Sequence, residues 1–554
     1  MYIAPNSDVF FMRNVPLDNA YIHTILFNSV GAQLAFVRSY QIDSVSEQSY
    51  IRLNDTRIRV NRIVNDLQKC NYMCFINRSV EASVRYYYAF ITNVIYINNS
   101  VTEIEFEIDI MQTWMMYVQP NACFIEREHT LTDEPGDNIL KENVDLGDSF
   151  LHSRQNVELI ETGSTTISDD IDLRPNMACI LTASAPDPQH DPIIPLSPII
   201  TNYGVYSNLA LYAFNLDNAA DVVKLYNWLN GANGQQQIDT NKIIAMYQYP
   251  AGWAAYAGSA ATDGLILNQK RYHIDKPTGA INGYTPVNKK LYTYPYCFLR
   301  LSNNQGDYSD LPYENFSDNV AEFNVSGTLL PIVSFYCAPV NYSGIGSNNE
   351  MWDMSISLKN FPVCCWQNDI FKNWWAENQN SFLTSAITGT LGAMTSGAVL
   401  GGGAGAIMGA VAGAGQSAAA NVAKITDMRN VPNTASNINM SYLISGADRY
   451  RYTFYNVSLK PQQLKSIDDY FSMFGYACRQ VKRPYRNARP HWTYVKTAGC
   501  TLKRIAQNTC IDSETAKKIC EIYDRGITFW NSAAEVGNYA LDNSPYSTPP
   551  ANPY

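Results

Sequence analysis

A strictly alternating run near residue 100 is the clearest pattern in the chain. Val101–Ile110 alternates acidic and apolar side chains, and Arg85–Ile97 before it is rich in aromatic and β-branched residues, with Asn98–Ser100 between them as a turn. Because successive side chains of a strand point to opposite faces, the two runs predict a β-hairpin whose second strand is half buried. We interpret its acidic face as solvated or lumen-facing rather than catalytic. That face comprises Glu103, Glu105, Glu107 and Asp109.

Strand-like patterns dominate elsewhere too, with a few short helices. Residues 1–130 and 291–365 are typical of strands, and residues 438–554 mix strands with a helix near Leu464–Tyr476. The predicted fold class is therefore mainly β with some α (α+β), in several domains. Further expected features are helices at Asp221–Leu229 and Thr240–Tyr247, a connector at Pro186–Pro198, loops or short strands over 251–285, a helix start at Asp369–Asn378 and an extended tail at Ser544–Tyr554.

The most unusual pattern is a tract without charged residues, from Asn378 to Ala423, in which small residues recur at every fourth position. In a helix such positions lie nearly above one another, so the spacing gives a smooth groove where two backbones approach closely. Glycine costs a helix about 1 kcal/mol relative to alanine, so close packing or a non-aqueous setting must offset the row. The row comprises Ser381, Ser385, Gly389, Ala393, Gly397, Gly401, Gly405, Gly409, Gly413 and Ser417.

The length of the tract suits two helices joined by a bend at Gly401–Gly403. Arms of about 20 residues, Phe382–Leu400 and Ala404–Val422, each match a hydrocarbon core of roughly 30 Å. The tract is only moderately apolar, so we predict a segment sheltered in the protein and delivered to a membrane later. A packed helical hairpin in an ordinary core and a disordered loop remain alternatives. The larger apolar residues are Phe382, Leu383, Ile387, Leu391, Met394, Val399, Leu400, Ile407, Met408 and Val411.

The composition favours a protein whose surface is largely buried in contacts with other copies of itself. Charged residues form only 16% of the 554 residues, while tyrosine, which suits subunit interfaces, occurs 38 times. A tyrosine-rich β monomer is the alternative. The net charge of −10 disfavours a protein that grips nucleic acid, because such affinity comes from neutralising phosphates. It suits a channel through which DNA slides, although acidity that serves only solubility is the simpler explanation.

Catalytic and metal signals are missing from the sequence. The six histidines form no HExxH pattern, no phosphate-binding loop occurs, and the 12 cysteines show no zinc-like pairing. We therefore expect no enzyme activity, no cofactor and no metal, and we expect buried reduced thiols. The first residues resemble no export signal, so we expect release by lysis.

One basic cluster carries a nucleic-acid-like signal. Its cations are interleaved with Tyr485, Trp492 and Tyr494, an arrangement typical of single-strand binders. In so acidic a chain we favour pairing with the carboxylates of a neighbouring subunit. The cluster comprises Arg479, Lys482, Arg483, Arg486, Arg489, His491 and Lys496.

Several short motifs occur in a fixed order, with the apolar tract in its place among them. They are Asn14-Val15-Pro16 with Tyr21, Phe106–Met115, Arg127-Glu128-His129, Tyr294-Pro295-Tyr296-Cys297, Val481–Pro484, Ile527–Trp530 and Gly537–Tyr539. In this order they resemble the tail-knob proteins of small, short-tailed phages with protein-primed genomes, the picovirus type. The resemblance covers the first 130 residues and most of the last 260, but not residues 150–290.

The resemblance implies a homohexameric tube at the tail tip of the virion, assembled in the host cytoplasm and joined to an upstream tail or lower collar protein. DNA would pass through its lumen without sequence-specific binding. The tract, residues 378–424, would plug the lumen and then insert in the host cytoplasmic membrane, and Arg127, Glu128 and His129 would form an interface ion-pair cluster. The implied pore-loop residues are Phe382, Leu383, Ile387, Gly389, Leu391, Gly397, Leu400, Gly401, Gly405, Ile407, Gly409, Val411 and Gly413.

The resulting division of the chain has five regions. Two functional alternatives stay open: a tail-associated enzyme that degrades cell walls, and a free-standing pore-forming protein. The regions are a β-rich tube domain (1–150), an insertion or knob region (151–290), a β-rich region (291–377), the apolar loop (378–424) and a C-terminal tube domain (425–554).

Overall fold

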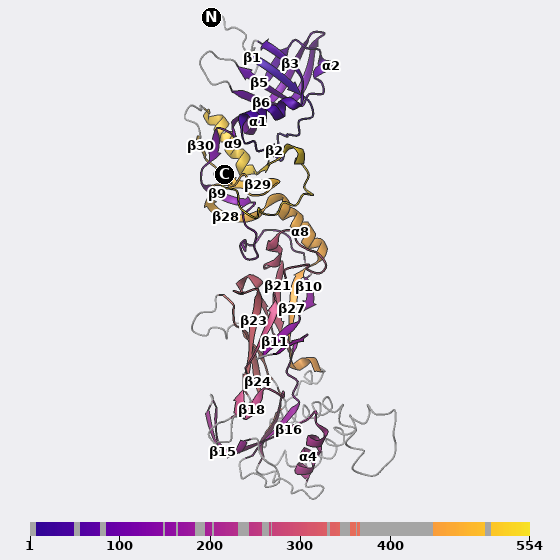
Figure 1. The fold of residues 1–554 in the computed structure, drawn as a ribbon, viewed down its shortest axis with the longest axis vertical. Coiled ribbons are helices and arrows are strands. Elements are labelled where there is room, and N and C mark those ends of the chain that lie inside the picture. The colour runs from indigo at the N-terminus through magenta and orange to yellow at the C-terminus, as the bar shows by residue number, and fades with distance from the viewer. Residues whose placement is uncertain are drawn as a thin grey trace, which may run out of the picture. The chain divides into compact units, whose positions relative to one another are not determined.

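The computed structural model is built mostly from strands, with few helices, as the sequence patterns predicted (Figure 1). The mainly β fold class is confirmed. The structure describes residues 7–48, 56–77, 85–147, 150–161, 164–182, 194–201, 204–230, 243–256, 265–267, 269–328, 333–343, 355–359, 361, 363–365, 447–504 and 511–554.

The chain forms two compact units, and each combines segments that lie far apart in the sequence. The first unit consists of Met1–Ser149, Thr278–Tyr296 and Leu459–Tyr554, and the second of Phe150–Pro277 and Cys297–Ser458. The predicted regions follow one another along the chain, whereas the first unit joins its beginning to its end. Residues 1–149 and most of the predicted C-terminal region thus share one unit.

The first sheet of the first unit has six antiparallel strands in the order β3-β1-β5-β6-β7-β4. The predicted hairpin is confirmed as β6 and β7. Apolar side chains cover both faces, with Val9 and Phe106 in one cluster and Tyr72 and Tyr88 in another. The strands are β1 Ser7–Met12, β3 Gln41–Gln48, β4 Arg57–Val60, β5 Tyr72–Asn77, β6 Tyr86–Asn98 and β7 Val101–Ile108, with helices α1 Val30–Ser39 and α2 Val64–Leu67.

The acidic face of β7 is not solvated as predicted. Glu103 is buried because β4 lies beside it and supplies Arg57 and Arg59, the latter with its Nε 2.8 Å from Glu103 Oε2. Asp109 is also buried, since it caps α3 (Ile110–Trp114) and accepts a hydrogen bond from the Tyr72 hydroxyl at 2.8 Å. Of the four carboxylates, Glu107 alone is exposed.

The second sheet of the first unit joins both ends of the chain in the order β2-β31-β29-β9-β28. The predicted helix near Leu464–Tyr476 is confirmed as α8, which begins at Pro461 and ends at Phe474. Helix α9 was not predicted, although Asp512 caps its start. The elements are β2 Thr24–Ile25, β31 Ile527–Trp530, β29 Trp492–Ala498, β9 Cys123–Glu128, β28 Tyr476–Lys482, α8 Pro461–Phe474 and α9 Ser513–Arg525, with β8 Val118–Pro120 paired to β30 Leu502–Arg504 and 3-10 turns at Lys289–Tyr292 and Ala533–Glu535.

The second unit contains three sheets of five or six strands and a two-stranded pair. Their orders are β12-β11-β20-β23-β24-β25, β10-β27-β21-β22 with β13 beside β27, β15-β16-β14-β17-β26, and β18-β19. The elements are β10 Phe150–Arg154, β11 Val157–Glu161, β12 Ser164–Ser168, β13 Ile171–Asp172, β14 Met177–Thr182, β15 Ile194–Thr201, β16 Gly204–Asn215, α4 Ala219–Asn230, β17 Ile243–Tyr249, β18 Ala254–Tyr256, β19 Leu265–Leu267, β20 Lys270–Asp275, β21 Cys297–Ser302, β22 Tyr308–Leu311, β23 Val320–Thr328, β24 Ser334–Pro339, β25 Ile356–Leu358, β26 Val363–Cys365 and β27 Arg451–Leu459, with 3-10 turns at Tyr313–Asn315 and Ala447–Tyr450.

Two helix predictions in the second unit had opposite outcomes. Helix α4 confirms the one at Asp221–Leu229. The helix predicted at Thr240–Tyr247 is wrong, because β17 occupies this part of the chain. Its β-branched and aromatic residues suit a central strand, and β17 pairs with β14 on one side and β26 on the other.

The apolar tract, residues 378–424, and the helix start at Asp369–Asn378 lie outside the described residues. Among the helices that the structure does describe, none is both long and apolar enough to span a bilayer.

Candidate functional site

The thirteen pore-loop residues of the sequence prediction all belong to the undescribed tract. The described residues include the other short motifs of the sequence analysis, and the structure shows which of these motifs contact one another. Most of them meet in the first unit, around the joint between the beginning and the end of the chain. This joint has an apolar part and a polar part.

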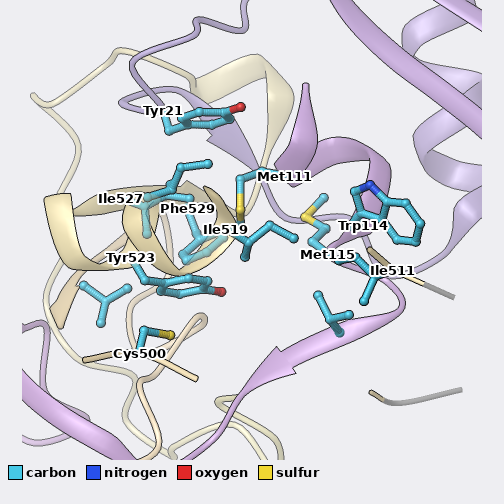
Figure 2. Close-up of a cluster of buried hydrophobic side chains, with 13 residues drawn as sticks. Tyr21, Met111, Trp114, Met115, Cys500, Ile511, Ile519, Tyr523, Ile527 and Phe529 are labelled. Atoms are coloured by element: carbon cyan, nitrogen blue, oxygen red, sulfur yellow. The ribbon is translucent and has the colours of Figure 1, made fainter. Parts of the chain in front are cut away.

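The apolar part is a cluster that packs the N-terminal motifs against α9 and β31. Figure 2 shows Tyr21 and Met111 gathered with Ile519 and Tyr523 of α9 and with Phe529 of β31. All five side chains are buried. Burying a large apolar side chain contributes about 1.5–3 kcal/mol, so residues that are hundreds of positions apart stabilise one core.

Hydrogen bonds fix the register of the same joint. Strand β2 runs parallel to β31, with Ile25 opposite Trp530. The Trp530 indole N–H donates to the Ile22 carbonyl at 3.1 Å, and the Gln112 amide donates to the Ile25 carbonyl at 3.0 Å. Tyr539 packs edge-on against the Trp530 ring, with ring centroids 5.1 Å apart. The motifs Ile527–Trp530 and Gly537–Tyr539 therefore contact each other directly.

The polar part centres on Glu142, whose side chain is buried between two cations. Lys290 Nζ lies 2.6 Å from Glu142 Oε1, and Arg127 contacts the other carboxylate oxygen. The Ala477 N–H donates to Glu142 at 2.8 Å, and Arg127 also donates to the Gly475 carbonyl at 2.6 Å. Burial lowers the pKa of Lys290, and the carboxylate of Glu142 opposes that shift. Three chain segments are thus tied by one carboxylate.

Glu128 and His129 are buried beside this group. Glu128 is paired with Lys482 and accepts from the Tyr485 N–H at 3.2 Å. Burial raises the pKa of the Glu128 carboxyl, and the Lys482 ammonium opposes the shift. His129 Nδ1 accepts the Tyr494 N–H at 2.8 Å, so its Nε2, 3.1 Å from the Ser472 carbonyl, carries the proton.

The His129 imidazole is held neutral. Burial lowers its pKa to about 3, and the nearby Arg489 and Arg127 act in the same direction. Both ring nitrogens are engaged by backbone groups. Neither nitrogen is therefore available to take a proton from a substrate, so this histidine positions β29 and α8 rather than serving as a base.

Asp468 of α8 organises the loop before β21. Its carboxylate accepts the Tyr284 hydroxyl and the Val287 N–H, each at 2.7 Å, and the Asn288 N–H at 2.9 Å. The Asn288 amide also donates to it at 2.7 Å. Tyr476, at the start of β28, donates its hydroxyl to Asp133 at 2.7 Å. Each of these groups is satisfied within the first unit.

These contacts correct the interface interpretation of Arg127, Glu128 and His129. Their partners lie in the same chain, and Glu128 and His129 are too deeply buried to reach another subunit. The partners are distant in sequence, as with Glu128 and Lys482. The sequence pattern therefore singled out these three residues, but it did not indicate that they join segments of one chain.

Three residues of the basic cluster are likewise paired inside the chain. Besides Lys482, Lys496 lies 2.7 Å from Glu126, and His491 lies 3.0 Å from Glu535. The indole of Trp492 is fully buried, so it cannot stack on a base. These three residues pair with carboxylates of the same subunit, rather than with those of a neighbouring subunit as predicted for the cluster.

Neither redox nor metal chemistry stands out in the described part of the chain. Nine cysteines of this part are free thiols, and eight of these nine are buried. No group of three or more His, Cys, Asp or Glu side chains among the described residues is placed to hold a metal ion. The buried polar groups around Glu142, Glu128 and Asp468 connect segments of the chain that are distant in sequence.

Known proteins similar to this chain come from phage tails. A family model for the C-terminal domain of tail knob protein gp9 of Bacillus phage phi29 matches residues 259–544, and a model for the N-terminus of the caudoviral major tail protein matches residues 5–119. The gp9 proteins of Bacillus phages phi29 and PZA are each 24% identical, over 97% of this chain and 98% of theirs. The tail knob protein gp12 of bacteriophage C1 has the same fold, with a TM-score of 0.59 at 15% identity over 97% of this chain and 99% of that one.

The chain is rich in strands, its polar clusters join its own segments, and its relatives are phage tail proteins. It is therefore a structural protein of a phage tail. The chain belongs to the family of tail knob protein gp9 of Bacillus phage phi29, whose model matches just over half of it. The resemblance to the tail-knob proteins of small short-tailed phages is thereby confirmed.

Proposed function

We propose that this chain builds the distal tube of the tail from six copies of itself. The tube joins an upstream tail or lower collar protein, and the phage DNA passes through its lumen without sequence-specific binding. The family match, which extends over residues 259–544, carries the proposal. The low charged fraction and the net charge of −10 support a surface shared among copies and a wall that does not hold DNA. We propose no catalytic role.

We further propose that the tract at 378–424 closes the lumen before infection and enters the host cytoplasmic membrane afterwards. The charge-free sequence and the row of small residues support this step. Six apolar segments are sheltered from water inside a dry lumen, and on release the bilayer is the nearest environment that accepts them. Small residues at every fourth position then let the inserted helices pack closely around an opening.

Replacement of Gly401, Gly405 and Gly409 by leucine tests the membrane step. We expect the triple variant to assemble like the wild type but to lose release of a dye from liposomes, because leucine side chains hold the helices apart. The matched control replaces Ala406 and Ala410 by leucine as well. These are small residues of the same tract, but they lie outside the row that contains Gly401, Gly405 and Gly409. Unchanged dye release by the triple variant would contradict the proposed packing.

Imaging tests the tube itself. Negative-stain electron microscopy of the purified protein, with its mass measured in solution, should show a six-fold ring or tube with a closed lumen. A compact monomer at all concentrations, with and without the upstream tail protein, would overturn the proposed assembly.

A further inference from the structure

Strand β12 forms one edge of the six-stranded sheet of the second unit. It pairs with β11 on one side, and in the described part of the chain no strand pairs with its other side. Its residues Thr165–Ser168 are exposed on both faces of the sheet. An edge of this kind offers a row of backbone donors and acceptors to any strand that approaches.

The opposite edge of the same sheet is covered by the chain itself. There the Tyr452 hydroxyl donates to the Ile356 carbonyl of β25, and the Asn303 amide donates to the Ser357 carbonyl, each at 2.9 Å. Ile356 and Leu358 are buried. The chain therefore caps β25 with its own side chains, whereas β12 stays open within the described residues.

Three other edge strands carry charges, which discourage pairing with another chain. Strand β3 contains Asp43 and Glu47, β4 contains Arg57 and Arg59, and β28 contains Arg479 and Lys482. In contrast, β12 reads Ser-Thr-Thr-Ile-Ser, without charge or proline and rich in β-branched residues. This composition favours strand pairing and lacks the usual protection against it.

One face of this edge also presents an apolar pair. Ile167 lies opposite Glu158, and Ile160 follows Glu158 by two positions on β11, so both isoleucines point to the same side of the sheet. Their side chains are 61% and 39% exposed. The His273–Glu322 ion pair, at 3.1 Å, lies further along the same face. An apolar centre beside polar groups is the usual composition of a subunit contact.

We propose that a strand of a second copy pairs with β12 and continues the six-stranded sheet across the subunit boundary. The inference rests on the proposed self-assembly. In a closed ring each copy presents the same edge to its neighbour, so all such edges are covered at once. A chain with only 16% charged residues suits such repeated contacts between copies. A second copy is therefore the occupant that these features support.

The test replaces Ile167 with lysine and measures assembly of the full chain by mass photometry across a concentration series. We expect the concentration for half-maximal assembly to rise by about tenfold or more, since a lysine on an edge strand opposes pairing. Ile42→Lys is the matched control. It places the same charge on a 50% exposed isoleucine of β3, an edge that already carries Asp43 and Glu47. This control should assemble like the wild type.

Hydrogen exchange of the wild-type chain gives an independent readout. The β12 amides should exchange quickly in dilute monomer and slowly in the assembled protein. Slow exchange in the monomer would overturn the inference, because a segment of the same chain would then cover the edge. Normal assembly of Ile167→Lys, with unchanged exchange at β12, would overturn the inference while leaving the proposed tube intact. A wild type that never assembles would refute both.

Discussion

Single buried groups in the first unit decide how its stability responds to pH. His129 is neutral in the folded chain, with a pKa lowered to about 3, mainly by burial. An unfolded histidine titrates near 6.5. Between these values the unfolded chain binds the extra proton, so the stability contributed by His129 is present above about pH 6.5 and declines as the pH falls toward 3.

His129→Gln should therefore flatten the dependence of stability on pH. The amide side chain does not titrate, so the wild type should lose roughly 2 kcal/mol more than the variant between pH 7 and pH 5. Thermal unfolding of both proteins at the two pH values measures the difference. Because Glu128 and Asp133, whose pKa values are raised by burial, are present in both proteins, their opposite contributions cancel. Parallel losses in the two proteins would show that His129 is not the titrating group.

At the scale of elements, the Asp468 side chain joins α8 to the loop before β21. Asp468→Ala removes the acceptor of four hydrogen bonds, among them the one from the buried Asn288 N–H. The free energy of unfolding should fall by about 3 kcal/mol or more. Near-UV circular dichroism during thermal unfolding measures this loss. The matched control is Asp469→Ala, the exposed neighbour on the same helix, which should change stability little.

Elements with a strong local pattern could be predicted from the sequence. The hairpin of β6 and β7 follows from alternation, and α8 follows from its apolar spacing. The strand β17 could not, because its partners β14 and β26 decide its conformation and lie far away in sequence. For the same reason the motif at Arg127–His129 was recognised while its role was mistaken, since Glu142 and Lys482 complete it from other segments.

At the scale of the whole molecule, the first unit depends on both ends of the chain. Trp530 is fully buried and joins β31 to the N-terminal segment through the Ile22 carbonyl. Trp530→Ala should cost about 3–5 kcal/mol. Hydrogen exchange should therefore accelerate in β1 and β29 together, while β23 of the second unit stays protected. Acceleration in β29 alone would contradict the shared core.

The same joint has a consequence for synthesis on the ribosome. Strand β31 begins 502 residues after the end of β2, so the partner of β2 is made long after β2 itself. At about 5–20 residues per second, the N-terminal segment waits roughly half a minute or more for it. Translation that stops before β31 thus yields a polypeptide in which β2 has no strand to pair with at this joint.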